Sequence, residues 1–330
     1  MFVDGERTVI VHAGREEILF AYRSTGQSIS RLFDVQLALG LLGGEFPASY
    51  GKLLQRILGE TVAKGETRTD WRRRPLSSAQ LDYAALDVLH LPQLYDALSS
   101  ELAKLGRLQW LEDELLRRQA SLIETQVQEG WHRMSGIQSL YGKQLGIVRE
   151  LWTWRDQRAE QKNMPARRVL RDDLIIELAK RGSSDAKKLH TSAAYTTLAS
   201  SDSFPKLQTA WPAACTPTPR SPWQGQGKRP RPPAILQQFL TAAMSYLCRT
   251  HNISPTIVGT SDDVGKLASY WMSGEELKST DPDYPHLLRG WRGELVGHPL
   301  YHIYSGKRAL RVKDPQDEMP LSLCDVESES

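Results

Sequence analysis

A stretch rich in proline, serine, threonine and glycine divides the sequence between residues 200 and 233, and it ends in PTPRSPWQGQGKRPRPP. Segments of this composition cannot bury enough apolar surface to order themselves, so we expect a disordered linker here. The chain has 330 residues, which is more than one ordinary domain of roughly 100 to 200 residues holds. We therefore expect two or three folded domains.

Strand signals are confined to the beginning of the chain. The β-branched run Thr8–Val11 predicts a short buried strand. After Ser77 the sequence becomes a series of amphipathic helical patterns interrupted by glycine and proline, and it ends in an acidic tail that we expect to be frayed. The sequence thus predicts a mixed α/β beginning and an all-α remainder.

One predicted helix carries two side chains of chemical interest. Ser77 and Gln80 form a capping-box pattern, which predicts a helix that starts directly after Ser77 and kinks or ends at Pro92. Tyr83 and Asp87 are four residues apart, so they share one stripe of this helix. Spacing alone favours a structural interpretation, with Asp87 exposed to solvent and Tyr83 half-buried.

Two further helices are predicted in the middle of the chain. The apolar spacing over residues 144–161 predicts a long helix, which Pro165 closes. Asp172 or Asp173 can start the next helix, and Gly182 is suited to be its C-terminal cap.

Composition excludes several classes of protein. The net charge of +3, from 42 basic and 39 acidic residues, does not establish a polyanion-binding protein. The three cysteines have no metal-ligand spacing and indicate neither a disulfide framework nor a zinc site. The N-terminus has no signal-peptide pattern, and nowhere do about 18 apolar residues run together. We therefore expect a cytoplasmic protein that does not enter a membrane.

Basic residues concentrate between residues 141 and 190, where twelve Lys or Arg stand against seven Asp or Glu. Trp152 and Trp154 lie among them. Such a segment can follow a phosphate backbone, and it is equally typical of a solvated helical face. Taken alone, the pattern slightly favours the solvated face.

Three segments near the N-terminus together resemble a known enzyme family. They are VHAGREEIL at 11–19, LFDVQLALGLLG at 32–43, and KGETRTDWRRRPLSSAQLDYAALDVLHLPQLYDAL at 64–98. In this order and spacing they resemble ribonuclease D, a 3′-to-5′ exoribonuclease of the tyrosine-bearing branch of the DEDD superfamily. Downstream, QLGIVRELWTWRDQRAEQKNMPARRVLRDDLIIELAK resembles the helicase-and-RNase-D C-terminal (HRDC) domain, and LLRGWRGELVG resembles the family's last helical domain.

The resemblance implies a fold class and a set of domains. The fold class is an α/β RNase H-like exonuclease domain, incomplete at its N-terminus, followed by all-α HRDC domains. The expected boundaries are an exonuclease domain over 1–105, a first HRDC domain over 106–200, the disordered linker over 201–233, a second HRDC-like domain over 234–312 and an acidic tail over 313–330.

The resemblance also implies roles for individual side chains. The family hydrolyses phosphodiester bonds with two Mg²⁺ or Mn²⁺ ions held by acidic residues. Asp87 would be a metal ligand, and Tyr83 would orient or help to deprotonate the attacking water. Glu17 would be the acid of the second motif, where the family usually has Asp. Asp34 is interpreted as a helix N-cap or a supporting group, and His12 as a hydrogen-bonded structural residue.

The family's first motif, a strand bearing Asp-x-Glu, has no counterpart in this sequence. Asp4-Gly5-Glu6 has the spacing, but only Arg7 separates it from the first strand, and one residue cannot form the remaining strands of a meander. We therefore expect a turn at Asp4-Gly5 and missing strands encoded upstream of Met1. The alternative is a catalytically inactive RNA-binding remnant.

The helical half is expected to bind RNA, because the family's HRDC domain guides RNA toward the nuclease. The residues expected to contact phosphates are Arg149, Arg155, Arg158, Arg167 and Arg168, the first three mainly on the outer face of the 144–161 helix. Trp291 and Arg292 are interpreted as a packing element between helices. The function implied is 3′-end trimming of structured RNA, with tRNA precursors as the substrate.

Overall fold

The protein is described by a computed structural model that places residues 5–61, 69–127, 130–181 and 229–326. They form two compact units, one from residues 1–123 and 229–330 and the other from residues 124–228. Each unit has its own hydrophobic core. Most of the linker predicted over 201–233 lies outside the described residues.

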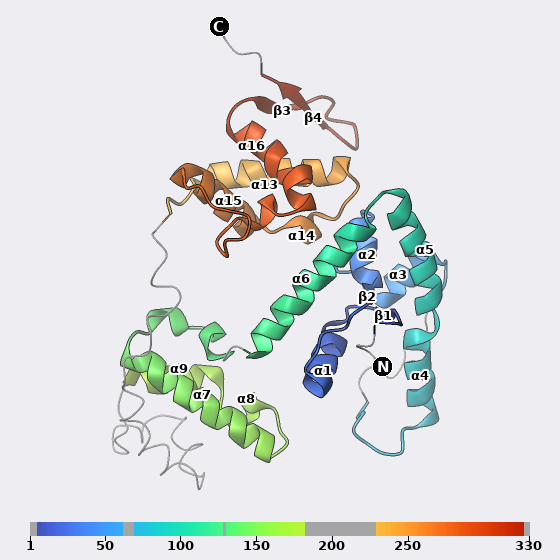
Figure 1. Ribbon diagram of the computed structural model, residues 1–330, viewed down its shortest axis with the longest axis vertical. Helices are drawn as coiled ribbons and strands as arrows, with labels where there is room; N and C mark the ends of the chain where they lie inside the picture. Colours follow the sequence, from blue (N-terminus) through green and yellow to red (C-terminus); the bar gives the residue numbers. More distant parts are fainter. Residues whose placement is uncertain (1–4, 62–68, 128–129, 182–228, 327–330) are drawn as a thin grey trace. The chain divides into compact units, whose positions relative to one another are not determined.

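The first part of the first unit combines a small parallel sheet with helices (Figure 1). Strand β1 (Val9–Val11) pairs in parallel with β2 (Leu32–Asp34), and Ile10 lies opposite Phe33. The strand predicted at the start of the chain is thus confirmed. The helices of this part are α1 (Arg15–Thr25), α2 (Val35–Leu41), α3 (Tyr50–Ile57), α4 (Ser78–Leu89), α5 (Leu91–Lys104) and α6 (Leu108–Val127).

The predicted boundaries of α4 are confirmed. Ser77 Oγ accepts a hydrogen bond from the Gln80 backbone N–H at 3.2 Å, and Gln80 Oε1 accepts one from the Ser77 N–H at 3.0 Å. This reciprocal capping box satisfies backbone donors that the first helical turn leaves free. Pro92 lies in the first turn of α5, where its missing N–H costs little.

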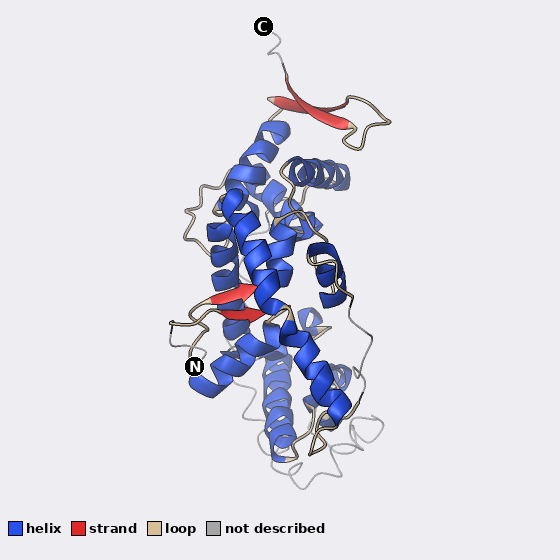
Figure 2. Ribbon diagram, turned by 90° about the vertical axis from the view of Figure 1, so that its right-hand side faces the viewer, coloured by secondary structure: helices blue, strands red, loops and turns tan. Residues whose placement is uncertain are grey.

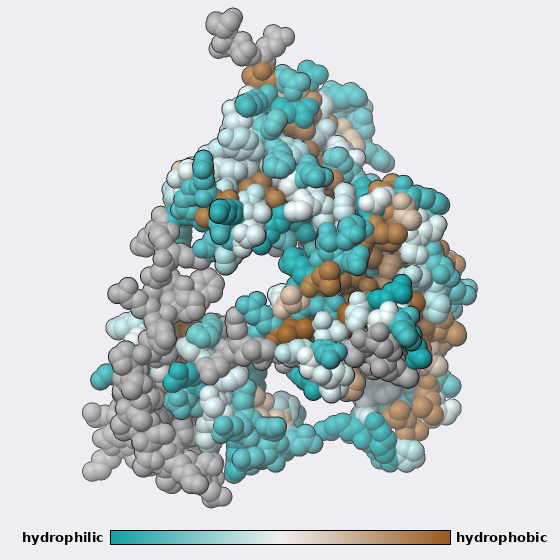
Figure 3. Space-filling model, viewed as in Figure 1, coloured by the Kyte–Doolittle hydropathy of each residue, from teal (hydrophilic) through white to brown (hydrophobic). Residues whose placement is uncertain are grey.

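The helices α4 and α5 differ in how much of their surface is buried. In α5, Leu91, Leu94, Leu98 and Leu102 are buried, whereas the one buried residue of α4 is Gln80. Leu81, Val88 and Leu89 of α4 are among the exposed large apolar residues. Figure 3 shows apolar residues at the surface on the side where Figure 1 draws these two helices. No helix among the described residues has the length and apolarity needed to cross a membrane.

The second part of the first unit is mainly helical. It contains α13 (Ala234–Thr250), α14 (Pro255–Val258), α15 (Ser261–Ser273), the 3₁₀ helix η5 (His286–Leu288), the π-helix η6 (Gly293–Gly297) and α16 (His298–Tyr304). It ends in an antiparallel hairpin of β3 (Arg308–Val312) and β4 (Leu321–Asp325), visible in Figure 2. The prediction of a frayed tail is therefore wrong for β4, because cross-strand hydrogen bonds order this segment despite its acidic composition.

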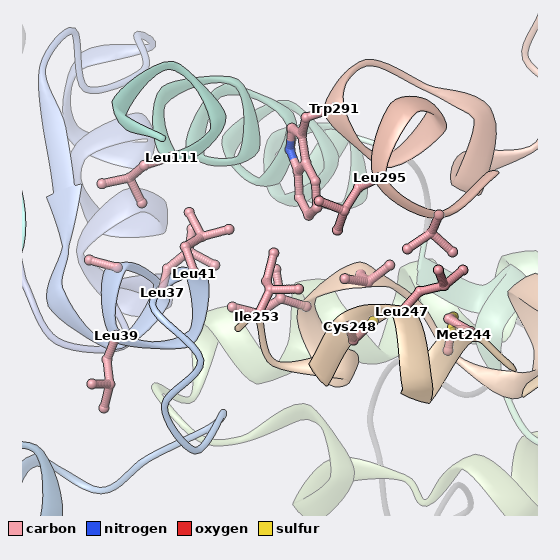
Figure 4. Packing of buried hydrophobic residues seen from close by; sticks show 14 of the residues in the cluster. Leu37, Leu39, Leu41, Leu111, Met244, Leu247, Cys248, Ile253, Trp291 and Leu295 are labelled. Carbon is pink, nitrogen blue, oxygen red and sulfur yellow. The ribbon is translucent and has the colours of Figure 1, made fainter. Parts of the chain in front are cut away.

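One hydrophobic core joins the two parts of this unit (Figure 4). Leu37 and Leu41 of α2 belong to the same cluster as Leu247 of α13 and Trp291. At Gly40 a Cβ atom would lie 2.2 Å from Ile257 Cδ1, so any larger residue there would force the Ile257 side chain to move where α2 meets α14. The segments predicted as separate domains over 1–105 and 234–312 thus pack as one compact unit, while their boundaries remain predictions.

Trp291 and Arg292 pack as the sequence predicts. Trp291 stacks on Trp110 of α6 with ring centroids 5.0 Å apart. Arg292 is buried and donates hydrogen bonds to the backbone oxygens of Ile257 and Val258 and to the Glu114 carboxylate. Both side chains connect helices within the unit.

The second unit is helical in its described residues. It contains the 3₁₀ helices η1 (Gly130–Arg133) and η2 (Ile137–Ser139) and the α-helices α7 (Lys143–Gln161), α8 (Ala166–Val169) and α9 (Asp172–Arg181). The predicted long helix is confirmed as α7 and the predicted start at Asp172 as that of α9. Gly182, the predicted cap of α9, lies outside the described residues.

Candidate active site

Asp34 braces the loop that precedes α1. Its carboxylate accepts hydrogen bonds from the backbone N–H groups of Ala13 and Gly14 at 3.2 and 3.0 Å, and it also caps α2 through the N–H groups of Gln36 and Leu37. Ala13 has a positive φ of 57°, a conformation that needs such support. Asp34 is therefore the helix N-cap and supporting group that the sequence predicts.

His12 is held by the backbone of another segment. Its Nε2 atom lies 3.0 Å from the carbonyl oxygen of Ala48. Because a carbonyl only accepts, Nε2 carries the proton, and Nδ1 keeps its lone pair when the ring is neutral. The prediction that His12 is a hydrogen-bonded residue is confirmed.

Asp87, His12 and Tyr50 influence one another electrostatically. Partial burial raises the pKa of Asp87, and the charge of His12 acts in the opposite direction. Burial likewise raises the pKa of Tyr50, an interaction with the His90 backbone lowers it, and the negative charge of Asp87 raises it. The rings of His12 and Tyr50 meet edge to face with centroids 5.5 Å apart. Two residues from separate segments, His12 and Tyr50, thus lie within electrostatic range of the Asp87 carboxylate.

Tyr50 has an unusual hydroxyl group that sequence reasoning missed. Its Oη atom is buried and forms no hydrogen bond of good geometry among the described residues, although the His90 backbone lies near enough to lower its pKa. A buried hydroxyl with only this weak backbone interaction retains the capacity to hydrogen-bond a ligand or water near Asp87. No local pattern around Tyr50 indicates this position, because Asp87 lies on a helix far along the chain.

Tyr83 is half-buried and lies one helical turn before Asp87 on α4. Its ring is in contact with the indole of Trp71, with centroids 5.9 Å apart. The predicted common stripe of Tyr83 and Asp87 is therefore present, with one side of the phenol supported by Trp71.

Glu17 lies in different surroundings. It is an exposed residue of α1, and with Val9, Phe20 and Ile29 it lines a mostly apolar cavity of about 280 Å³. Carboxylate oxygens suit hard cations, but no group of three or more His, Cys, Asp and Glu side chains that could hold a metal ion occurs in the described part of the chain. Asp87 and Glu17 therefore offer the right ligand atoms without completing a two-ion centre.

The arginines predicted to bind RNA are not equivalent. Arg167 and Arg168 are exposed on α8, and Arg149 and Arg158 are partly exposed on α7. Arg155, by contrast, is buried and forms an ion pair with Asp172 at 2.5 Å.

The prediction that Arg155 lies on the outer face of the helix is wrong. The start of α9 brings the Asp172 carboxylate and the Leu170 carbonyl oxygen against this side of α7. Both accept hydrogen bonds from the Arg155 guanidinium. The pairing with Asp172 compensates the burial of the charge.

Comparisons with known proteins agree with this architecture. A family model described as 3′-5′ exonuclease matches residues 1–103, and the HRDC domain model matches residues 144–193. Ribonuclease D of Sphingobium indicum is 30% identical over 97% of this chain and 81% of its own length. Ribonuclease D of Pseudomonas paraeruginosa is 31% identical over 88% of this chain and 76% of its own length.

A solved structure with the same fold is Escherichia coli RNase D, described as an exoribonuclease involved in structured RNA processing. It is 22% identical, with a TM-score of 0.70 over 92% of this chain and 80% of the other. The fold class expected from the sequence, an RNase H-like exonuclease domain with an HRDC domain, is confirmed.

Proposed function

The chain belongs to the ribonuclease D family and is a hydrolytic 3′-to-5′ exoribonuclease, and we propose that it trims the 3′ ends of structured RNA, tRNA precursors among them. The observation that carries this proposal is the similarity to ribonuclease D over nearly the whole chain. The fold shared with Escherichia coli RNase D, which acts in structured RNA processing, supports the substrate class.

The proposed active-site residues lie on α4 and, for Glu17, on α1. Tyr83 would hold and orient the attacking water through its hydroxyl group, and Asp87 and Glu17 would supply carboxylate ligands. We propose Mg²⁺ or Mn²⁺ as the cofactor and two-ion phosphodiester hydrolysis as the reaction, because hard cations take oxygen ligands. The raised pKa of Asp87 supports a functional role, since partial burial disfavours the charged form of this carboxylate and a bound cation would stabilise that form.

The proposed RNA-guiding surface lies on the second unit. Arg167 and Arg168 of α8 carry it, together with the accessible parts of Arg149 and Arg158 on α7. Arg155 is left out of this surface because its guanidinium is buried against Asp172. Exposed arginines of this kind bind phosphates without reading base sequence.

The decisive experiment compares two carboxylates of one helix. Asp87→Asn should slow the shortening of a 5′-labelled RNA from its 3′ end, at saturating Mg²⁺, by at least about a thousandfold. Asp82→Asn is the matched control, because Asp82 is an exposed residue of α4 whose carboxylate accepts a hydrogen bond from Ser78 Oγ at 3.5 Å. Equal turnover by the two variants would contradict the site assignment.

A second candidate function is RNA binding without turnover. The observation that favours it is that the described residues do not complete a centre for two metal ions. This alternative expects salt-sensitive RNA binding with no 3′-end shortening at any Mg²⁺ or Mn²⁺ concentration. Measurable metal-dependent shortening that disappears in Asp87→Asn would exclude it.

A further inference from the structure

A cavity lined by arginines opens in the first unit, between α6, the start of α15 and the segment around η5. Its volume is about 480 Å³. The polar side chains that line it and matter here are Arg117, Arg118, Thr260, Asp263, His286 and Arg289. None of them belongs to the proposed exonuclease site on α4 and α1.

A buried carboxylate pairs with two of these arginines. Glu114 has a fully buried side chain and pairs with Arg117, with Arg118 at 3.0 Å and with Arg292 at 2.7 Å. Burial by itself raises the pKa of Glu114, but the hydrogen bonds from Arg117 and Arg118 and the charge of Arg292 lower it to about 2. One negative charge is thus shared by three guanidinium groups.

A fourth guanidinium adds positive charge. Arg289 donates hydrogen bonds to the backbone oxygens of Asp281, Pro282 and Tyr284, and these neutral acceptors compensate no charge. Asp263, the other acid of the cavity, is already engaged by the Thr260 N–H and hydroxyl group at the start of α15. Four arginines therefore stand against two carboxylates in a partly desolvated space, which favours an added anion.

Donors toward this anion are available. Within the described residues Arg118 hydrogen-bonds only through Nε, to Glu114, so its two Nη groups are free to face a ligand. The Arg118 side chain is 36% exposed and that of Arg117 is 47% exposed, so both are reachable from solvent. The planar guanidinium fork matches two oxygens of a phosphate group.

We propose that this cavity, which we call the arginine pocket, binds a phosphate group, supplied either by an RNA backbone or by free phosphate or a nucleotide. The lowered pKa of His286 supports the positive character of the site. Burial and the charges of Arg292 and Arg117 lower the pKa of His286 to about 4. A bound phosphate opposes that positive field, so it should make His286 easier to protonate.

The experiment uses the full chain and two probes. Binding of inorganic phosphate is measured by calorimetry, and binding of a 3′-blocked RNA by fluorescence anisotropy over a series of salt concentrations. Arg118→Gln should weaken the binding of phosphate at least about tenfold. The matched control is Arg56→Gln, which removes an exposed arginine of α3 and should change neither measurement.

The two probes distinguish the sources of the phosphate. If RNA supplies it, Arg118→Gln also lowers RNA affinity and reduces the slope of log K against log salt by about 1. If free phosphate or a nucleotide supplies it, RNA affinity equals that of the control while phosphate binding falls. No saturable phosphate binding by the unaltered protein, together with control-like RNA binding by Arg118→Gln, overturns the proposal.

A readout on the unaltered protein covers the case in which Arg118→Gln does not fold. Phosphate added to the full chain should raise the pKa of His286, followed by the chemical shifts of its imidazole ring. If the pKa of the His286 ring is unchanged at saturating phosphate, the proposal is contradicted. Both readouts measure binding, so a failure of the proposed substrate or site assignment for the exonuclease does not affect them.

Discussion

Two carboxylates of the first unit, Glu114 on α6 and Asp87 on α4, lie in opposite environments. Glu114 is fully buried, paired with three arginines, and has a pKa lowered to about 2. Asp87 is an exposed residue, and the partial burial of its carboxylate raises its pKa. No arginine or lysine contributes to that change in pKa. The comparison teaches that the more buried acid is the structural one. The acid whose charge is poorly compensated is the one for which we propose a cationic ligand.

The largest expected effect on stability comes from Glu114. Glu114→Gln leaves Arg292 buried without its carboxylate partner, and it should lower the free energy of unfolding by about 3–5 kcal/mol. Urea denaturation followed by tryptophan fluorescence measures this. A loss below about 1 kcal/mol would show that the stability of the first unit does not depend on this buried ion pair. Glu114 would then not be the structural acid that its contrast with Asp87 suggests.

The helices themselves provide the next test. Leu111 of α6 is 3% exposed, so Leu111→Ala should cost about 2–4 kcal/mol of unfolding free energy by leaving a cavity. Leu89 of α4 is 61% exposed, and Leu89→Ala should stay within about 0.5 kcal/mol. Equal losses at the two positions in the same denaturation assay would mean that α4 is packed as firmly as α6.

The stability of the first unit should depend on pH in two successive windows. His286 has a pKa lowered from 6.5 to about 4, so the unfolded chain binds its proton first, and stability falls as the pH drops from about 6.5 to 4. Glu114, with a pKa lowered from 4.5 to about 2, adds a loss below pH 4.5.

The contribution of His286 can be isolated by mutation. His286→Gln should remove the first window, on the order of 2–3 kcal/mol, and leave the second in place. Unfolding free energies at pH 7.5, 5.5 and 4.5 measure the difference. An unchanged slope between pH 6.5 and 4.5 in the variant would assign the first window to another group.

The smallest expected effect on stability is that of Asp87. Because its pKa is raised, the folded state disfavours its charged form, so Asp87→Asn should leave unfolding free energy at pH 7 unchanged or slightly increased, within about 0.5 kcal/mol. The same variant is the one expected to lose turnover. A large loss of stability would place Asp87 in the same structural class as Glu114.

Much of the local fold can be predicted from residues close together in the sequence. The capping box of Ser77 and Gln80 and the position of Pro92 set the limits of α4 and α5, because caps and proline act within one turn of the backbone. The order of β4 could not be predicted in this way, since its stability comes from pairing with β3 and not from its own acidic residues.

The candidate site could be predicted only in part. Tyr83 and Asp87 share a stripe because the helical repeat places them there, and the resemblance to ribonuclease D singled them out. Tyr50 escaped notice because only the folded chain brings its ring beside His12 and its hydroxyl within the influence of Asp87. Arg155 was misplaced because helical periodicity does not reveal that Asp172 covers that side of α7.

The sequence by itself determined the family, the ends of the helices and the stripe that carries Tyr83 and Asp87, since these depend on motifs and on backbone geometry over a few residues. Only the tertiary structure decided which charges are buried and which remain available. Glu114 and Arg292 are 178 positions apart in the chain, yet they form one buried pair. The physical reason is that burial and charge compensation depend on whichever segments the hydrophobic core brings together, and sequence distance carries no information about them.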